Sequence, residues 1–352
     1  MNDDFYSRFF GDKNDFENSS DSFSFGEGVV KGAKRTFSRL FLALSAYLII
    51  SILLINAVSV LLYFASESAY ILVFGTELGQ SALNATVQYL IALPVFWLMV
   101  RKMETKVPSA YTSVTPREFI SFFLIAEILM TLGNYIGLMF NATVGTYLGT
   151  EAINHTAQSI KNAPLWVSFV FAVILVPIAE ELLMRKLFID RLAKYGTGFA
   201  VIVSAVTFGI FHGNFYQFFY AALTGLVLGA IYVRGGLKYS VALHMLINFR
   251  GSVVALLYNR SLEIALLGDT SSIIFWLSLV IAVMYSILAA VILFLGIRLL
   301  IRCIRALRYS FHPFEGRTVT LPEGSLRGAL FGNAGAIVFL IISGISLILS
   351  FF

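Results

Sequence analysis

The feature that most constrains this chain is a series of long apolar blocks, several of which exceed the roughly 18–20 residues that span a bilayer core. Hydrophobic residues make up 58% of its 352 residues and charged residues only 13%. Soluble domains average about 45–50% apolar and about 25% charged residues. The excess apolar residues are collected in the blocks, so the sequence predicts an all-α, polytopic transmembrane helix bundle rather than a soluble domain.

The blocks predict about nine helices, with boundaries set to within a few residues. They lie at about 40–64, 82–100, 118–140, 164–187, 197–212, 215–233, 238–257, 273–297 and 328–350. The predicted organisation is therefore an acidic, disordered cytoplasmic tail (1–36), N-terminal transmembrane helices (37–141), a central core (164–257), one further helix (273–297), a basic cytoplasmic linker (298–327) and a C-terminal helix (328–352). The tail lacks the basic start and apolar core of a signal peptide.

Positive charge predicts how the helices are oriented. Basic residues precede the first helix, which places the N-terminus in the cytoplasm. They recur in loops 101–117 and 186–196, whereas loops 65–81 and 141–163 hold at most one. This alternation predicts that the first two loops are cytoplasmic and the last two lie outside. The net charge of +5 is thus explained by topology, and no nucleic-acid partner is predicted.

Ionisable residues inside membrane helices are costly and usually functional, and the first of three such groups lies in the block 164–187. Glu181 and Arg185 are four residues apart, so they share a helix face in the favourable acid-before-base order. Glu180 points about 100° away from Glu181 and can face a different partner. Pro177 removes a backbone donor one turn earlier, which can open room beside the acid.

The other two groups supply histidines. Phe208 and His212 share a helix face, and so do His244 and Asn248. Convergence of the three groups predicts a carboxylate, two imidazoles and an amide in a mostly apolar cavity. Amide hydrolysis needs a base to activate water, donors for the oxyanion and an acid for the leaving amine. These residue types can supply all of them.

Each group also has a purely structural interpretation. Glu181 and Arg185 are compatible with a simple intrahelical ion pair. His212 could cap a helix end against water, and His244 with Asn248 could join two helices by hydrogen bonds. All three motifs, in this order and each within an apolar helix, are harder to attribute to packing alone.

In these motifs the sequence resembles the CPBP family, the Abi or type II CAAX prenyl endopeptidases, which includes lysostaphin-resistance-protein-A-like bacterial proteins. The family pattern is Glu-Glu-x-x-x-Arg, then Phe-x-x-x-His, then His-x-x-x-Asn. The chain matches it, over roughly 164–257, with Glu180, Glu181, Arg185, Phe208, His212, His244 and Asn248. Many relatives have glycine after the motif arginine, where this chain has Lys186.

The resemblance implies an intramembrane endopeptidase in which Glu180 activates water together with His212. It further implies that His244 and Asn248 stabilise the oxyanion, and that Glu181 and Arg185 support the site. The implied partners are the lipid bilayer and a membrane-associated protein or peptide substrate, prenylated or otherwise hydrophobic. The expected location is a bacterial plasma membrane.

Helix lengths conflict with this convergence. At 1.5 Å per residue, Glu180 and His244 lie about 10 Å inside the predicted cytoplasmic boundary, whereas His212 lies roughly 22 Å inside it. The helix 197–212 must therefore be short, tilted or begin within the membrane. Irregular backbone at that depth is tolerated where it lines a water-filled cavity, which a hydrolase needs.

Two other functions compete with the protease. A proton- or ion-coupled transporter could use Glu127, Glu180 and Glu181 as a relay, although the paired repeats typical of carriers are not found. A catalytically silent membrane scaffold could retain the same core. The peptidase is the favoured prediction.

A zinc protease is an alternative mechanism for the enzyme. Glu180, Glu181, His212 and His244 are potential ligands, but no His-Glu-x-x-His element is present. Ligating histidines normally donate their other nitrogen to a carboxylate or carbonyl, and Asn248 is a poor substitute. We therefore predict hydrolysis without a metal or other cofactor.

Overall fold

The computed structural model describes residues 27–106, 112–150, 154–310, 312–322 and 324–351, and in these ranges every regular element is helical. Seven helical stretches are long and apolar enough to cross a membrane. The pair α16 (Ser325–Phe331) and α17 (Ala334–Leu349), bent by 57°, would make an eighth. The predicted all-α, multi-pass bundle of about nine helices is confirmed. Most of the predicted acidic tail lies outside the described residues.

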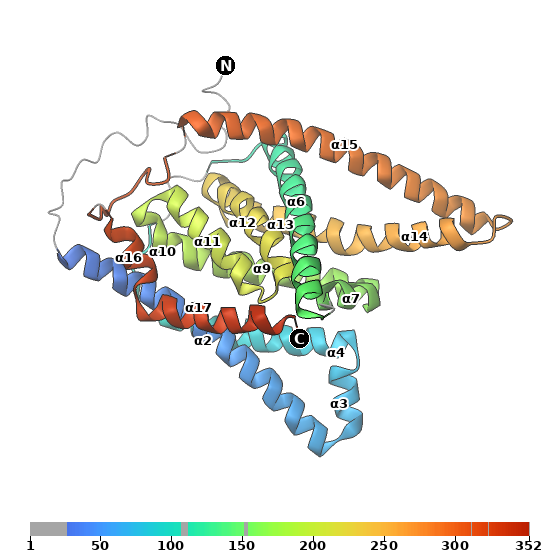
Figure 1. Cartoon of the computed structure of the whole chain (residues 1–352), viewed down its shortest axis with the longest axis horizontal. Helices are drawn as coiled ribbons and strands as arrows, with labels where there is room; N and C mark the ends of the chain where they lie inside the picture. The colour runs from blue at the N-terminus through green and yellow to red at the C-terminus, as the bar shows by residue number, and fades with distance from the viewer. Residues whose placement is uncertain (1–26, 107–111, 151–153, 311, 323, 352) are drawn as a thin grey trace.

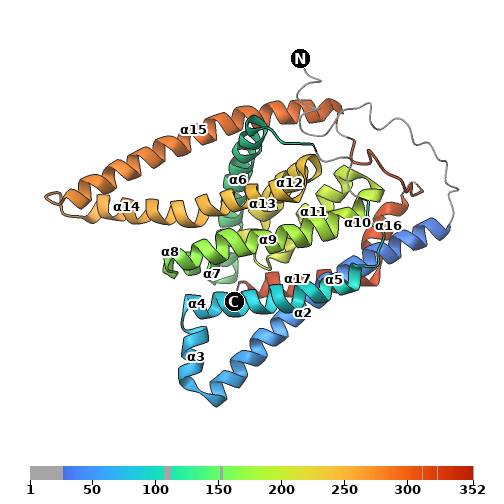
Figure 2. The same ribbon diagram turned by 180° about the vertical axis from the view of Figure 1, so that it is seen from behind.

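The N-terminal part forms a V in both views (Figures 1 and 2). One arm is the 39-residue helix α2 (Glu27–Ala65), which begins within the predicted tail. The short helix α3 (Glu67–Phe74) turns the chain between the arms, and Ser66 and Thr76 cap the helices that follow them. Residues 65–81, predicted as a loop, are therefore largely helical. The returning arm consists of α4 (Glu77–Ala85), the π-helical η2 (Thr86–Ala92) and α5 (Leu93–Val100).

The centre of the molecule is built around α6 (Pro116–Leu148), which packs against α12 (Phe215–Gly235). A capping box between Thr115 and Glu118 fixes the start of α6. The two helices approach closely at Gly133, where an added Cβ would lie 2.4 Å from the Cα of Tyr220. This contact holds the backbone of α12 at Tyr220 close against α6.

The fourth span runs without interruption from Leu165 to Tyr195, so the prediction that it ends at residue 187 and that 186–196 is a loop was wrong. The charges taken as loop residues have partners both along the helix and on neighbouring segments. Lys186 pairs with Asp190 at 2.9 Å, and Asp190 also accepts a 2.6 Å hydrogen bond from the Tyr232 hydroxyl. The segments along this span are α8 (Leu165–Val167), η3 (Ser168–Leu175), α9 (Val176–Glu181), η4 (Leu182–Ile189), α10 (Asp190–Leu192) and η5 (Ala193–Tyr195).

A tight turn at Gly196 joins this span to α11 (Thr197–Phe211). Gly196 has φ +129°, and an added Cβ would lie 2.6 Å from the Pro313 carbonyl oxygen. Only glycine fits this conformation and this contact. The first amides of α11 donate to the 313–315 segment, from Phe199 N to Pro313 O at 2.8 Å and from Thr197 N to Glu315 O at 3.2 Å.

The remaining helices complete the central core and form one projecting arm. The chain is helical without a break from Leu237 to Leu267, about ten residues beyond the end predicted for the helix 238–257. Both views show α14 and α15 extending away from the bundle and meeting at its far tip (Figures 1 and 2). The elements are α13 (Leu237–Asn248), η6 (Phe249–Val254), α14 (Ala255–Leu267), α15 (Ile273–Ser310) and α7 (His155–Asn162), which precedes the fourth span.

Candidate active site

The turn at Gly196 sets the depth of the predicted catalytic residues. Glu180 precedes Gly196 by 16 residues and His212 follows it by 16. Each therefore lies about 24 Å from the turn at 1.5 Å per residue. The conflict in depth between Glu180 and His212 came from ending the fourth helix at 187. α11 has 15 residues, about the length predicted for the fifth helix, so the longer fourth helix removes the conflict, and a shortened, tilted or recessed fifth helix is not needed.

One cavity of about 530 Å³ is lined by all four residues predicted to be catalytic, which are Glu180, His212, His244 and Asn248. Phe208 also lines it. They come from α9, the end of α11 and α13, so three elements separated in sequence converge as predicted. Glu181 and Arg185 do not line the cavity; both side chains are fully buried.

Glu181 connects the buried charges to the cavity. Its Oε2 accepts from Arg185 Nε at 3.0 Å, and its Oε1 lies 3.0 Å from His244 Nδ1. Arg185 Nη1 donates to Ser204 Oγ at 2.9 Å, and that hydroxyl donates to the Met184 carbonyl at 2.9 Å. A buried charge is tolerated only when it is paired and hydrogen-bonded, and this network supplies both conditions.

His244 faces a carboxylate on each side. Its Nδ1 contacts Glu181, and its Nε2 lies 3.7 Å from Glu180 Oε2, which is too long for a hydrogen bond. A carboxylate accepts, so Nδ1 carries the hydrogen in this contact. Nε2 therefore carries a hydrogen only when the ring is an imidazolium. Neutral His244 offers the cavity an acceptor and no donor.

His212 is constrained in the same way, but by its own helix. Its Nδ1 donates to the Phe208 carbonyl at 2.7 Å, which leaves Nε2 of the neutral ring as an acceptor. The Phe208 ring makes edge-to-face contacts with both imidazoles, with centroid distances of 4.7 Å to His212 and 6.0 Å to His244. The Arg185 guanidinium also packs over the Phe208 ring, 5.1 Å from its centroid. Phe208 therefore contacts Arg185 as well as both imidazoles.

Asn248 is fixed by a gap in the backbone ladder of the fourth span. In the π-helical η3, the amide of Val176 donates to the carbonyl of Phe171, five residues back. The next residue, Pro177, has no amide hydrogen, so the Ala172 carbonyl loses its partner in this register. Asn248 Nδ2 donates to it at 2.9 Å instead. One amide hydrogen of Asn248 is left for the cavity.

The sequence motifs missed further residues that line the same cavity, among them Gln217, Tyr220 and Arg250. Arg250 contacts the buried Glu127 and donates from Nη1 to the Tyr285 hydroxyl at 2.9 Å. Glu127 is thus the partner of a cavity-lining arginine. Gln217 and Tyr220 follow the helix-capping Asn214 at intervals of three. An N-cap followed by polar residues on one face is the signal that could have found them.

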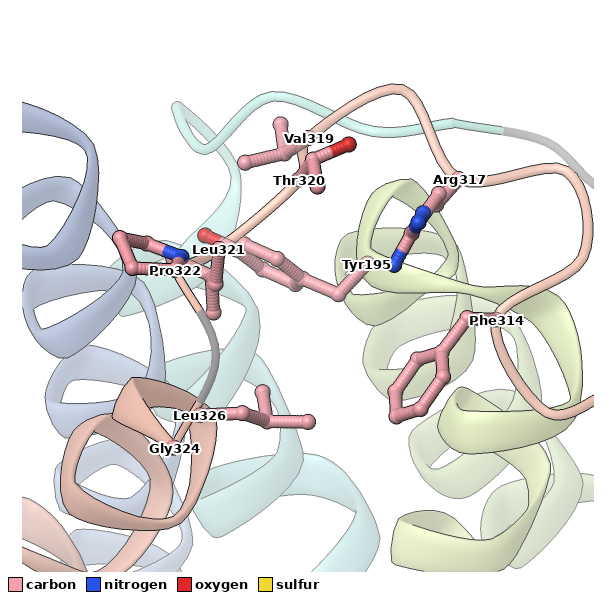
Figure 3. Close-up of a pocket in the computed structure, with 9 residues that line it drawn as sticks. All are labelled: Tyr195, Phe314, Arg317, Val319, Thr320, Leu321, Pro322, Gly324 and Leu326. Atoms are coloured by element: carbon pink, nitrogen blue, oxygen red, sulfur yellow. The ribbon is translucent and has the colours of Figure 1, made fainter. Parts of the chain in front are cut away.

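The fourth span and α11 form a helical hairpin with its turn at Gly196. A second cavity of about 420 Å³ lies at this turn, at the opposite end of the hairpin from Glu180 and His212 (Figure 3). It is formed between Tyr195 of the hairpin, the segment carrying Phe314 and Arg317, and Leu326 of α16, and its lining includes none of the predicted catalytic residues. Its residues fix the 313–319 segment over the turn at Gly196.

Comparison with known proteins covers this central part of the chain. Residues 162–250 match a family described as "Type II CAAX prenyl endopeptidase Rce1-like". The resemblance to the CPBP family is confirmed here. The matched segment is about a quarter of the chain and holds all seven residues of the motifs. It supports a peptidase of the intramembrane kind. Neither the curated proteins nor the solved structures compared with the chain give a match.

The donor set was also compared with that of a metal site. In the part of the chain that the structure describes, no group of three His, Cys, Asp or Glu side chains is placed to hold a metal ion. Glu181 is already committed to Arg185 and to His244 Nδ1. Hydrolysis without a metal stays a prediction.

Proposed function

We propose that this protein is an intramembrane endopeptidase in which Glu180 activates a water molecule to attack a peptide bond. The observation that carries the proposal is the single cavity lined by Glu180, His212, His244 and Asn248, with the fully buried Glu181–Arg185 pair behind it. His244 in the wall of this cavity is only 6% exposed, and electrostatic interactions with reacting groups are stronger at such a site than in bulk water.

In the proposed mechanism, water attacks the peptide carbonyl carbon while its proton passes to the Glu180 carboxylate. The carbonyl oxygen becomes an oxyanion as the C–O bond forms. Collapse of this intermediate breaks the C–N bond, and the proton held by Glu180 passes to the leaving amine. His212 Nε2, an acceptor in the neutral ring, orients the attacking water. The products are a carboxylic acid and an amine, and the proton that the acid loses on ionisation passes to the amine.

The proposed roles of the other residues depend on whether they line the cavity and on which of their hydrogen atoms remain free to donate to the oxyanion. Asn248 has one amide hydrogen available to an oxyanion. His244 adds a second donor when it is an imidazolium, held between Glu180 and Glu181. Phe208 and Arg185 keep the two imidazoles and the Glu181 carboxylate in place. Arg185 and Glu181 are therefore positioning residues, because neither lines the cavity.

The proposed substrate is a membrane-associated protein or peptide, prenylated or otherwise hydrophobic, that reaches the cavity from the bilayer. The proposed location is a bacterial plasma membrane, with the N-terminus and the Gly196 turn on the cytoplasmic side. Zinc-assisted hydrolysis is the alternative mechanism, and an ion-coupled transporter or a silent scaffold is the alternative function.

Reconstitution separates the enzyme from the transporter. Purified protein in phosphatidylcholine–phosphatidylglycerol liposomes would be given internally quenched peptides, one with a prenylated cysteine and one with an apolar sequence. We expect cleavage of at least one peptide, with the new termini identified by mass spectrometry. Proton or cation flux across the same liposomes without cleavage would instead favour the transporter, through Glu127, Glu180 and Glu181.

A further inference from the structure

The four residues predicted to be catalytic offer few hydrogen-bond donors that are available in every protonation state. Neutral His244 has none to offer, because its Nδ1 hydrogen is committed to Glu181. Neutral His212 has none either, because its Nδ1 hydrogen is committed to the Phe208 carbonyl. Asn248 has already given one amide hydrogen to Ala172. An oxyanion is usually held by at least two donors, so a further donor is needed.

A polar chain along the start of α12 ends at a suitable group, the hydroxyl of Tyr220. Asn214 Oδ1 accepts from the backbone amide of Gln217 at 2.9 Å, which fixes the orientation of the Asn214 side-chain amide. Asn214 Nδ2 then donates to Gln217 Oε1 at 2.7 Å and to the His212 carbonyl at 3.0 Å. The chain is thereby anchored to His212 itself.

The same orientation fixes the direction of the next bond. Because Gln217 Oε1 accepts from Asn214, Gln217 Nε2 faces the Tyr220 hydroxyl and donates to it at 2.9 Å. The Tyr220 oxygen is thus an acceptor in this bond, and its own hydrogen is directed elsewhere. No acceptor for that hydrogen is found among the described residues.

The surroundings of Tyr220 hold its ring in place at the cavity. It lines the cavity together with Glu180, His212, His244 and Asn248. Its ring packs against both hydrophobic core clusters, and Gly133 of α6 admits its backbone at close range. A donor that is fixed before the reaction needs no reorganisation when charge develops.

We infer that Tyr220 is a further catalytic residue, whose hydroxyl donates to the oxyanion formed at the scissile carbonyl, and that Asn214 and Gln217 are its positioning residues. This inference rests on the proposed endopeptidase function. Tyr220 supplies a donor whether or not His244 is protonated. Asn248 and Tyr220 together give the oxyanion two neutral donors.

Tyr220→Phe tests the inference because it removes the hydroxyl and keeps the ring. We expect kcat to fall by about 10²–10³-fold, as for loss of one oxyanion donor, with KM unchanged. Tyr216→Phe is the matched control, since Tyr216 is one turn earlier on α12 and is not among the residues that line the cavity; its kcat should be unchanged. Gln217→Met should lower kcat less than Tyr220→Phe does, again without a change in KM.

A second readout reports on the reacting oxygen alone. The cleaved peptide would be made with sulfur in place of the scissile carbonyl oxygen, and the ratio of the oxo to the thio cleavage rate compared between proteins. Sulfur accepts hydrogen bonds poorly, so the ratio should be smaller for Tyr220→Phe than for the unsubstituted chain. A variant that was merely unfolded in part would lose both rates equally.

The outcomes distinguish the role of Tyr220 from the proposed endopeptidase function. An unchanged kcat, or an unchanged oxo-to-thio ratio, for Tyr220→Phe would overturn the role of Tyr220 while the unsubstituted protein still cleaves. Full activity of Glu180→Gln, or no cleavage by the unsubstituted protein, would overturn the proposed function and this inference with it. Reduced kcat and a reduced ratio for Tyr220→Phe, with Tyr216→Phe normal, would support the inference.

Discussion

The buried pair of Glu181 and Arg185 gives the sharpest test of how the site is supported. Both side chains have 0% exposure, and their charged atoms are 3.0 Å apart. Removing one partner of a buried pair typically costs about 3–5 kcal/mol, because the other charge is left without compensation. We therefore expect Arg185→Met and Glu181→Gln each to lower the free energy of unfolding by an amount in this range.

The double variant should cost less than the sum of the two single changes. With both charges gone, no unpaired charge is buried, and the side-chain amide oxygen introduced by Glu181→Gln could still accept from His244 Nδ1. We expect a coupling energy of about 2–3 kcal/mol, which lies at the upper end of values for residues in direct contact. The measurement is denaturant titration in detergent micelles for the four proteins of the cycle, monitored by near-ultraviolet circular dichroism.

A pair with the same separation but more exposure supplies the control. Lys194 and Glu104 are 2.9 Å apart, but the Glu104 side chain is 76% exposed. Exposed pairs are worth about 0–1 kcal/mol, so the cycle Lys194→Met with Glu104→Gln should give a coupling of that size. Additive effects of Glu181→Gln and Arg185→Met, or a coupling no larger than that of the control, would refute the role assigned to the buried pair.

Three further predictions concern packing, topology and metal. Gly133→Ala should destabilise the protein, because the added Cβ would collide with the backbone of Tyr220. Gly344→Ala, with nothing within 4 Å of its added Cβ, should be neutral or stabilise the protein by up to about 1 kcal/mol. Thermal unfolding in detergent compares the two variants. On a Cys303→Ser background, Lys102→Cys should be labelled from the cytoplasmic side and Ser66→Cys from outside, and the reverse would overturn the map. Prolonged chelation should leave active protein without stoichiometric zinc, whereas activity lost and restored only by zinc would favour the metalloprotease.

The helices and the main site residues were predictable because their signals are local. Apolar length indicates a span, and spacing of four residues places Glu181 beside Arg185 and His244 beside Asn248 on their helices. The three motifs line one cavity, as their order in apolar helices led us to expect, and the catalytic roles of their residues stay predictions.

The end of the fourth helix was not predictable from local signals. Lys186 and Asp190 look like loop residues in the sequence, and only the fold shows that they pair with one another and with Tyr232. The same applies to Pro177, whose effect depends on the π-helical register of η3. The partner of Asn248 follows from that register and lies 76 residues away.

Tyr220 and Arg250 were missed for a related reason. Aromatic residues are common in apolar helices, so Tyr220 does not stand out in the sequence. An arginine in an apolar helix is rarer, but Arg250 belongs to none of the three motifs. Their roles depend on which helix lies opposite, and on partners such as Glu127 and Gln217 that no short motif connects. Contacts between elements distant in sequence are what the structure adds.

Glu180→Gln is the most direct test of the central claim that Glu180 activates the attacking water. The amide keeps the shape of the side chain but cannot take the proton, so kcat for the cleaved peptide should fall by about 10²-fold or more. Glu180 is partly exposed to the cavity and lies 3.7 Å from His244, so insertion and thermal stability should persist. Near-normal kcat for Glu180→Gln in the same liposomes would contradict the mechanism, whereas loss of cleavage by a stable, inserted protein is the result that we predict.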